Sequence, residues 1–333
     1  MRLDGLDIAR FLAFVGMVLV NFRIAAEVTG VGDLPSTIID LLEGRAAALF
    51  VVLAGIGLGL SRAGMALVSR RAVFLIVLGM INVTIFEADI LHYYGTYFLC
   101  VLPLLTAPAR ALWTAAVAVA LIAYAGLIFG NYDAGWDWDA LVYADFWTVT
   151  GYLRHTFYNG WHPVLPWLSF LMIGMALSRL DLGSPAIRLR IALYGALACI
   201  AGLIPAALTA DPDLTDLLST APIPPTPFYI LSATGSACVV IAACLWAGPA
   251  LMRSRLTRTL SLAGRQSLTL YLAHILIGMG TMDTLGLLNG SLSNAAVLWI
   301  SLSFCAACLI YAHLWQYVAK RGPLEALMRK LAG

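Results

Sequence analysis

The chain has 333 residues, of which 61% are hydrophobic and only 11% are charged. Soluble globular chains are typically about 45–50% apolar and about 25% charged. This composition excludes an ordinary soluble enzyme, a disordered chain and a nucleic-acid-binding protein. The formal net charge of +2 is uninformative as a sum, but the positions of the charges are informative. The sequence indicates an integral membrane protein embedded in a lipid bilayer.

Ten apolar segments are long enough to cross a membrane. A crossing helix needs roughly 20 mostly apolar residues, and the sequence shows none of the period-2 alternation of a membrane barrel. The sequence therefore predicts an all-α bundle of about ten transmembrane helices, with residues 1–333 forming a single polytopic membrane domain. The expected spans are 8–26, 36–60, 70–88, 89–108, 110–129, 163–180, 187–209, 228–249, 262–281 and 294–318.

Three connecting segments carry distinct patterns. Residues 130–161 combine four tryptophans with four aspartates, which predicts an amphipathic stretch at the outer membrane interface. Residues 210–227 end in a run of prolines, and we expect them to be extended rather than helical. Residues 321–333 predict a basic amphipathic helix on the cytoplasmic surface, because leucines recur there at helical spacing beside basic residues.

The positive charges set the orientation. Cytoplasmic loops of membrane proteins carry an excess of lysine and arginine. If the N-terminus is cytoplasmic, most acidic residues face outward and 17 of the 20 positive residues lie on the inner side. Both termini are therefore expected in the cytoplasm. The inner residues are Arg2, Arg10, Arg62, Arg70, Arg71, Arg110, Arg179, Arg188, Arg190, Arg253, Arg255, Arg258, Arg265, Lys320, Arg321, Arg329 and Lys330.

Several polar residues lie inside or at the ends of the expected spans, almost all in the outer half of the membrane. Such residues are costly in lipid, and they usually face a cavity or a partner. Their convergence predicts one outer cavity. The members of this candidate site are Asn21, Glu43, Arg45, Asp89, His92 and His162.

The candidate residues also have structural interpretations. Asp89 and His92 are three residues apart on one helix face, so the carboxylate can orient the imidazole as a general base or simply form a structural bond. Glu43 and Arg45 do not face each other at this spacing, and they can serve as contacts within the bundle. His155 is expected to be a solvated loop residue. The five histidines are scattered, and the sequence predicts no metal site.

Six motifs, in order along the chain, carry a resemblance to known proteins. They are R-L-D-G-L-D-I-A-R-F-L-A-F-V-G-M-V-L-V-N ending at Asn21, E-G-R-A-A-A-L-F at 43–50, D-I-L-H-Y-Y-G at 89–95, P-V-L-P-W-L-S-F-L-M-I-G-M-A-L-S-R-L-D-L at 163–182, G-R-Q-S-L-T-L-Y-L-A-H at 264–274 and G-P-L-E-A-L at 322–327. The set resembles the YeiB-type bacterial membrane proteins. It is also similar to the catalytic membrane domain of heparan-alpha-glucosaminide N-acetyltransferase.

This resemblance implies a transmembrane acyltransferase in the bacterial inner membrane. Such an enzyme moves an acyl group from a cytoplasmic acyl-CoA-type donor to an acceptor at the outer side. The glucosaminide enzymes have an active-site histidine in the outer loop after the first span, whereas residues 22–35 of this chain contain none. Another histidine must then serve, or the chemistry differs.

The residues themselves suggest roles for this reaction. His92, oriented by Asp89, is the first choice of general base, and His162 is the second. Asn21 and Arg45 can donate hydrogen bonds to the acyl carbonyl, with Glu43 positioning one of them. On the inner side Arg10, Arg70, Arg71 and Arg265 can bind the donor's phosphates, although the positive-inside rule alone already accounts for them. Asp7 and Arg10, three residues apart, are expected to pair.

Two other classes of function fit the same composition. A non-enzymatic subunit of a larger membrane complex predicts that the polar cluster is internally bonded and closed. A small-molecule transporter also places charges in a cavity, but the expected pair of broken spans in corresponding halves is not visible in the sequence. The acyltransferase predicts a cavity that opens to the outside.

Overall fold

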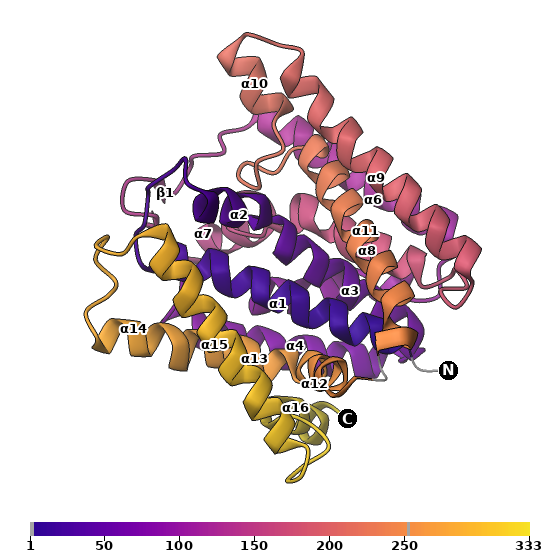
Figure 1. Ribbon diagram of the computed structural model, residues 1–333. Coiled ribbons are helices and arrows are strands. Elements are labelled where there is room, and N and C mark those ends of the chain that lie inside the picture. Colours follow the sequence, from indigo (N-terminus) through magenta and orange to yellow (C-terminus); the bar gives the residue numbers. More distant parts are fainter. Residues whose placement is uncertain (1–2, 252–253) are drawn as a thin grey trace. The chain divides into compact units, whose positions relative to one another are not determined.

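The computed structural model describes residues 3–251 and 254–333, and these residues are mostly helical (Figure 1). The helices are α1 (Asp4–Ala25), α2 (Leu34–Leu42), α3 (Arg45–Ser61), α4 (Met65–Val83), α5 (Leu91–Cys100), α6 (Ala109–Phe129), α7 (Val149–Arg154), α8 (Val164–Leu177), α9 (Pro185–Ala207), α10 (Pro212–Leu218), α11 (Pro227–Leu251), α12 (Arg255–Gly264), α13 (Ser267–Ala273), α14 (Gly280–Thr284), α15 (Asn294–Trp315) and α16 (Pro323–Ala332). Short helical turns are η1 (Leu102–Leu104), η2 (His155–Asn159) and η3 (His274–Met279), and two strands, β1 (Trp136–Asp137) and β2 (Val142–Tyr143), form a hairpin.

The chain forms two compact units. The first unit contains the described residues of Met1–Phe50, Leu182–Ala192 and Ala237–Lys330. The second contains Val51–Asp181, Leu193–Ser236 and Leu331–Gly333. Helices α3, α9, α11 and α16 contribute residues to both. Each unit is described separately below.

The structure supports a multi-pass membrane protein. Among the described residues, seven helices are long and apolar enough to cross a membrane, or up to eight if α7–η2 and α8, bent by 51° at their junction, form one span. The expected span 89–108 contains instead the ten-residue α5 and the turn η1, and 262–281 is divided among α12, α13, η3 and α14. The count of ten and the cytoplasmic termini therefore stay predictions. Of the basic residues behind that orientation, Arg2 and Arg253, with the side chain of Arg255, lie outside the described residues.

In the first unit, α1 packs against α12 and α15 (Figure 1). The expected span 36–60 lies within Leu34–Ser61, one of the seven candidate spans, and within it α2 ends and α3 begins at the E-G-R sequence. Glu43 ends α2, and Gly44 has a φ of 67°, a left-handed conformation that glycine adopts without steric cost. Arg45 then begins α3. Glu43 and Arg45, which the sequence placed inside one span without facing each other, therefore lie on either side of a helix break.

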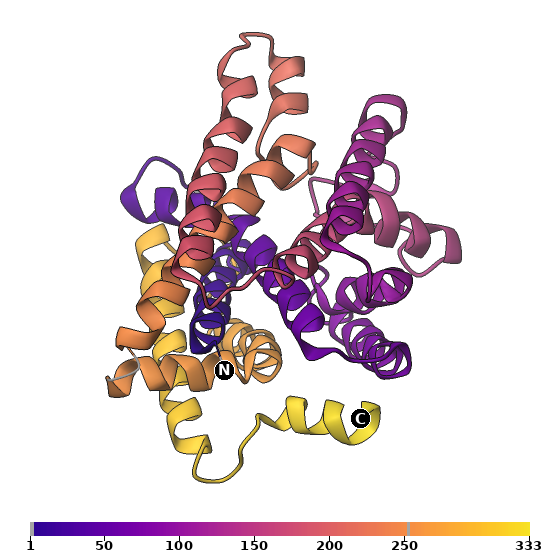
Figure 2. The same cartoon turned by 90° about the vertical axis from the view of Figure 1, so that its right-hand side faces the viewer.

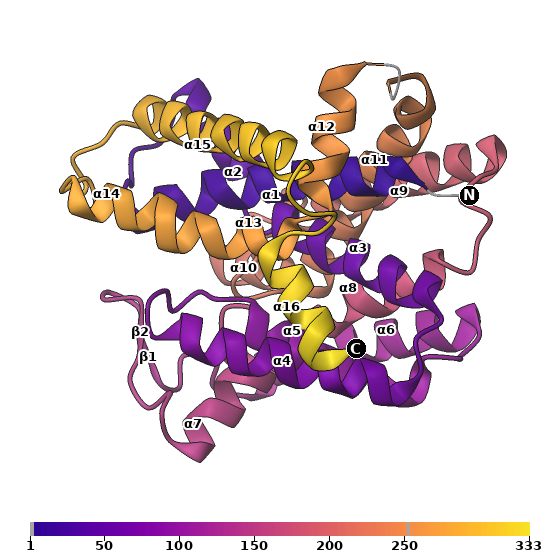
Figure 3. The ribbon, with the colours of Figure 1, turned by 90° about the horizontal axis from the view of Figure 1, so that it is seen from below.

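In the second unit, α4 packs along α5 and α6 along α8 (Figure 3). The second-unit parts of α9 and α11 also lie side by side and are connected through α10 (Figure 2). Because α5 is short and begins soon after α4 ends, the chain reverses at residues 84–90. This reversal places Asp89 and His92 beside the last turn of α4.

Of two expectations for the connecting segments, one stays a prediction and one needs correction. Residues 130–161 contain the β1–β2 hairpin, α7 and η2, and their amphipathic, interfacial character stays a prediction. Residues 210–227 are not wholly extended, because α10 begins at Pro212, and proline is tolerated in the first turn of a helix, where no N–H is needed. The predicted C-terminal helix is present as α16.

Candidate functional site

Asp89 and His92 are both fully buried in the second unit. One carboxylate oxygen of Asp89 accepts from Asn82 Nδ2 of α4 at 2.7 Å, and the other accepts from the Leu91 backbone N–H at 2.8 Å. His92 Nδ1 is 3.5 Å from the same carboxylate, beyond a good hydrogen bond. Asp89 therefore caps the start of α5, and its pairing with His92 is secondary.

His155, which the sequence predicted to be a solvated loop residue, is buried beside His92. His155, in η2, is 2% exposed, and its ring lies nearly parallel to that of His92 with centroids 6.1 Å apart. The hydroxyl of Tyr93, the residue after His92, is 2.9 Å from His155 Nδ1. The expectation that His155 is solvated is wrong, because the rings of Trp136, Tyr143 and Phe146 surround it.

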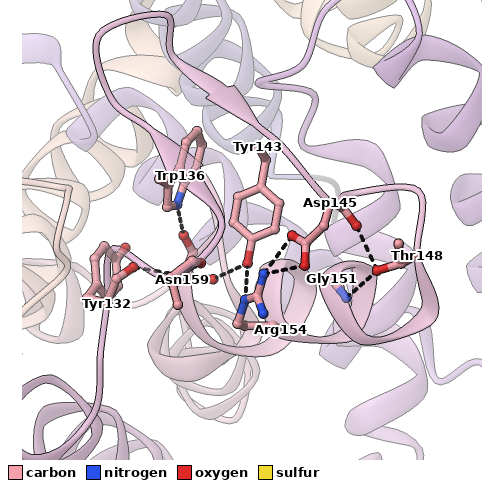
Figure 4. Close-up of polar contacts among 9 residues, drawn as sticks. Tyr132, Trp136, Tyr143, Asp145, Thr148, Gly151, Arg154 and Asn159 are labelled. Carbon is pink, nitrogen blue, oxygen red and sulfur yellow. Dashed lines mark hydrogen bonds and ion pairs between the residues drawn. The ribbon is translucent and has the colours of Figure 1, made fainter.

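The segment around His155 is held by a polar network (Figure 4). Arg154 Nη2 donates to both carboxylate oxygens of Asp145, at 2.6 and 2.7 Å, and Arg154 Nε donates to the Tyr143 hydroxyl. That hydroxyl donates in turn to Asn159 Oδ1 at 2.8 Å. Charge-assisted hydrogen bonds of this kind are stronger than neutral ones. The β1–β2 hairpin is therefore fixed against the helical segment that carries His155.

A pocket of about 510 Å³ lies between this segment and the end of α4. We name it the Glu87–His155 pocket. Its rim includes Ile85 and Trp147, which are 60% and 68% exposed, whereas His155 is almost completely enclosed. The pocket thus connects the surface of the unit to a buried imidazole. The lining residues are Val83, Thr84, Ile85, Glu87, Val142, Tyr143, Ala144, Phe146, Trp147, His155 and Trp161.

The chemistry of the pocket wall favours a neutral or cationic ligand. Val83 and Thr84 are at the C-terminus of α4, where unpaired carbonyls give a helix a partial negative charge. Glu87 adds a carboxylate, and partial burial raises the pKa of Glu87 above its usual value. The lining residues that the structure describes include no lysine or arginine, and the aromatic rings add negative π faces.

His162, the second predicted base, lies close to this group at the break between η2 and α8. Its ring is 5.8 Å from that of Tyr93 and 4.6 Å from that of Trp167. Tyr97 donates its hydroxyl proton to the His162 carbonyl. The structure thus brings three of the predicted residues, Asp89, His92 and the half-buried His162, into one largely buried layer beside the pocket, and His155 is the histidine on the pocket wall.

The remaining predicted site residues, Asn21, Glu43 and Arg45, belong to the first unit. Asn21 Nδ2 lies 3.0 Å from His274 Nε2, and His274 Nδ1 bonds to the Tyr271 carbonyl. His274 is fully buried. A carbonyl can only accept, so Nδ1 carries the proton and Nε2 accepts from the Asn21 amide.

The acidic and basic residues near the α2–α3 break form a separate cluster. Glu43 Oε2 is 3.6 Å from Arg23, which also bonds to Asp40 at 2.5 Å. Arg45 is half-buried at the first position of α3, and its backbone N–H donates to the Glu43 carbonyl at 2.7 Å. The Glu43 carboxylate is thus paired with Arg23, a residue that the sequence had not assigned to it.

The predicted pair of Asp7 and Arg10 is confirmed, with an N–O distance of 2.5 Å. Arg265 approaches the other Asp7 oxygen at 3.4 Å, so two of the four arginines assigned to donor phosphates share one carboxylate. In the second unit, Arg71 donates to the Gly333 carbonyl at 3.2 Å, whereas Arg70 is exposed. Among residues 3–251 and 254–333, no group of three or more histidine, cysteine or acidic residues is arranged to hold a metal ion.

Comparison with protein families finds two matches that together cover nearly the whole chain. A model of the catalytic region of heparan-alpha-glucosaminide N-acetyltransferase matches residues 2–203. A family described as a protein of unknown function, DUF418, matches residues 177–333. No curated protein matches the chain. The first match contains the Glu87–His155 pocket and the buried layer beside it.

Proposed function

Because the chain belongs to the heparan-alpha-glucosaminide N-acetyltransferase catalytic family, we propose that it is a membrane acyltransferase that acylates an amine bound in the Glu87–His155 pocket. One observation carries this proposal: a pocket with a negative, aromatic wall leads to an enclosed imidazole. An amine is a cation near neutral pH, and such a wall suits it. The family name specifies transfer of an acetyl group to nitrogen, which agrees with an amine acceptor.

Glu87 has the central chemical role in this proposal. Its carboxylate binds the ammonium group and takes one proton, and the raised pKa makes Glu87 a stronger base than an ordinary glutamate. The free amine then attacks the carbonyl carbon of an acyl thioester. The carbon–sulfur bond breaks, the amide forms, and the thiol leaves with the second proton of the attacking nitrogen. Asp89, His92 and His162 support the pocket wall from the buried layer.

The finer features of the reaction are also proposed. The donor is an acyl-CoA-type thioester from the cytoplasm, the acceptor lies at the outer side, and the membrane is the bacterial inner membrane. Asn21, Glu43 and Arg45 lie in the first unit, where Asn21 bonds to His274 and Glu43 pairs with Arg23, and they are not part of the proposed pocket. The donor's phosphates are assigned to Arg70 and Arg71, which belong to the same unit as the pocket, whereas Arg10 and Arg265 pair with Asp7 in the first unit.

The test uses acetyl-CoA with a labelled acetyl group and glucosamine as the probe acceptor, with protein purified in detergent. We expect acetylation of the amine, and a loss on the order of 10²–10⁴-fold in Glu87→Gln, the usual contribution of a proton-transfer group. Thr84→Ala is the matched control on the same wall. Equal rates in Glu87→Gln and Thr84→Ala would reject the assignment, and melting temperatures identify variants that fail to fold.

A second candidate, a non-enzymatic subunit of a larger membrane complex, is favoured by one specific observation. Both carboxylate oxygens of Asp89 already accept hydrogen bonds from within the unit, as a closed structural network requires. This candidate predicts a folded protein that transfers no acetyl group and that co-purifies with other membrane proteins from mild detergent.

A further inference from the structure

We propose that the acceptor of the Glu87–His155 pocket is a long-chain amine, whose ammonium group binds at Glu87 and whose hydrocarbon tail lies along an exposed apolar ridge of α4. The inference rests on the proposed function for the reaction that the amine undergoes. Its structural basis is the continuity between the mouth of the pocket and the ridge, and binding of the amine can be tested without turnover.

The ridge consists of branched aliphatic side chains spaced four residues apart. They are Val73, Val77 and Ile81 in α4 and Ile85 just beyond its end, and each is between 54% and 60% exposed. Side chains four residues apart form a continuous row on a helix surface. The opposite side of α4 packs against α5 (Figure 3), where a β-carbon at Gly79 would overlap the backbone of His92. The ridge therefore faces away from the core of the second unit.

The ridge ends at the mouth of the pocket. Ile85 is both its last member and a lining residue of the pocket, and Glu87, two residues further along the chain, also lines it. Val142 and Trp147 on the same rim are apolar as well, and they are 40% and 68% exposed. A carboxylate thus lies next to continuous apolar surface, which is complementary to an amphiphile with a cationic head group.

The extent of the ridge matches the tail of a lipid-like molecule. Helix α4 is one of the seven candidate membrane spans, and exposed apolar side chains on a span contact lipid hydrocarbon. The helix rises about 12 Å from Val73 to Ile81, most of the roughly 15 Å that one leaflet contributes to a hydrocarbon core about 30 Å thick. The end of α4 then lies near the lipid head groups, where an exposed tryptophan such as Trp147 is also favoured.

The pocket wall offers few hydrogen bonds to an acceptor with many hydroxyl groups. The Thr84 hydroxyl donates to the Ile81 carbonyl at 2.7 Å, and the Tyr143 hydroxyl donates to Asn159 Oδ1 at 2.8 Å. Both hydroxyl protons are therefore used within the protein. The described lining residues also include no lysine or arginine to pair with a phosphate. The wall thus favours a simple alkyl amine over an amino sugar or an aminophospholipid.

The product of such an acceptor is an N-alkyl amide. Glu87 takes one proton from the ammonium group, and the nitrogen attacks the carbonyl carbon of the acyl thioester. The carbon–sulfur bond breaks, and the thiol leaves with the second proton of the nitrogen. The tail takes no part in these steps, so both the amine and the amide can exchange with the bilayer along the ridge.

The first experiment locates the tail without requiring turnover. Dodecylamine with a photoreactive diazirine in the middle of its chain is added to phosphatidylcholine vesicles that contain the protein, and peptide mapping measures labelling after illumination. We expect residues 73–85 to be labelled several times more than residues 193–204 of α9, an exposed apolar face that does not line the pocket. Dodecanoic acid with the same diazirine is the control, because its charge is opposite. Equal labelling of the two faces by the amine, or equal labelling of α4 by amine and acid, would overturn the proposal.

A substitution at Glu87 tests the contact with the ammonium group in the same assay. We expect Glu87→Gln to lower labelling of residues 73–85 by the amine about two- to fivefold, since the carboxylate is partly exposed and water screens its charge. Labelling by the acid should not fall. Asp139→Asn is the matched control, because this exposed carboxylate belongs to the hairpin turn and does not line the pocket. Unchanged labelling by the amine in Glu87→Gln would contradict the proposed binding mode.

The second experiment compares acceptors in acetyl transfer from acetyl-CoA, in the same vesicles. We expect kcat/KM for dodecylamine to exceed that for butylamine and for glucosamine at least about tenfold, because each methylene group removed from water favours binding. Equal values for butylamine and dodecylamine, or equal transfer to phosphatidylethanolamine, would refute the assigned acceptor class. If glucosamine is the best acceptor, the proposed function stands and this inference fails. If no amine is acetylated but the amine still labels α4 selectively, the proposed function fails and the binding of a long-chain amine stands.

Discussion

Glu325 caps a helix at Leu268, 57 residues earlier in the sequence. Substitution of Glu325 therefore tests how much this contact contributes to the stability of the first unit. Its carboxylate accepts from the backbone N–H groups of Leu268 and Thr269, at 2.8 and 3.1 Å, and from the Thr269 hydroxyl at 2.5 Å. These N–H groups belong to the first turn of α13, where the residue before the helix, Gln266, supplies no side-chain cap. A carboxylate from α16 thus satisfies donors that a helix start leaves unpaired.

The expected cost follows from these three contacts. A hydrogen bond to a charged group contributes about 1.5–3 kcal/mol net, but Glu325 is only half-buried, and water can replace part of what is lost. For Glu325→Ala we expect a loss of about 2 kcal/mol in total. At about 2–4 °C per kcal/mol for a chain of this order of size, the melting temperature should fall by about 4–8 °C. Glu325→Gln keeps one acceptor oxygen and should lose roughly half as much.

The assay is thermal unfolding of purified variants in one detergent, followed by tryptophan fluorescence. Arg329→Ala is the control, because this exposed residue lies on the same helix and makes none of these contacts. A melting temperature of Glu325→Ala within about 1 °C of the parent, less than the shift expected for a single cap, would refute the reasoning. It would mean that α13 does not depend on α16.

Three further predictions address charge, pH and topology. Asp7→Asn should lower the melting temperature by several degrees, because Arg10 and Arg265 lose their shared partner; an unchanged melting temperature with loss of acetyl-CoA binding would instead place Asp7 in the donor site. Burial raises the pKa of Glu87, so the ionised base appears only as pH rises through that higher pKa. The acid limb of the kcat/KM profile should therefore lie above the usual glutamate range. This limb should vanish in Glu87→Gln. A membrane-impermeant thiol reagent applied from outside should label Asp139→Cys but not Arg62→Cys; the reverse pattern would invert the predicted orientation.

The long helices could be predicted from the sequence because apolar runs in a membrane protein have few alternatives to a helix. The spans expected at 110–129 and 294–318 appear as α6 (Ala109–Phe129) and α15 (Asn294–Trp315). The pair of Asp7 and Arg10 was also accessible, since a spacing of three residues places both on one helix face. These features depend on periodicity within a single segment.

The site was harder to predict because its contacts join distant segments. His155 follows Arg154 in a segment rich in aspartate and tryptophan, and nothing local indicates that it is buried. Its enclosure depends on Tyr93, 62 residues earlier, and on the hairpin that carries Trp136 and Tyr143. One signal was available: the density of aromatic residues in 130–161 exceeds what an interfacial stretch needs, and aromatic rings commonly enclose a functional group.

The spacing of Asp89 and His92 in the sequence suggests that the carboxylate orients the imidazole, whereas the structure shows that the shorter contacts of Asp89 are with other groups. Its position three residues before His92 was recognised, but its short hydrogen bonds go to Asn82 and to the Leu91 backbone. Because Tyr93 lies in the first turn of α5, the cap made by Asp89 also determines where the Tyr93 hydroxyl lies. An effect of Asp89 on catalysis is therefore expected to act through the start of this helix.

Two substitutions at Asp89 separate the cap from an electrostatic role. Asp89→Ala leaves the buried Leu91 and Asn82 donors unpaired, which costs about 1–3 kcal/mol for each group, so stability and kcat should fall together. Asp89→Asn keeps an oxygen for the Leu91 N–H. The Asn82 amide can rotate to accept from the new side chain, since its own oxygen has no hydrogen-bond partner among the described residues. We expect Asp89→Asn to stay within about 1 kcal/mol of the parent and to retain most of its kcat. A large loss of kcat at an unchanged melting temperature would show instead that the negative charge itself orients His92 as the base.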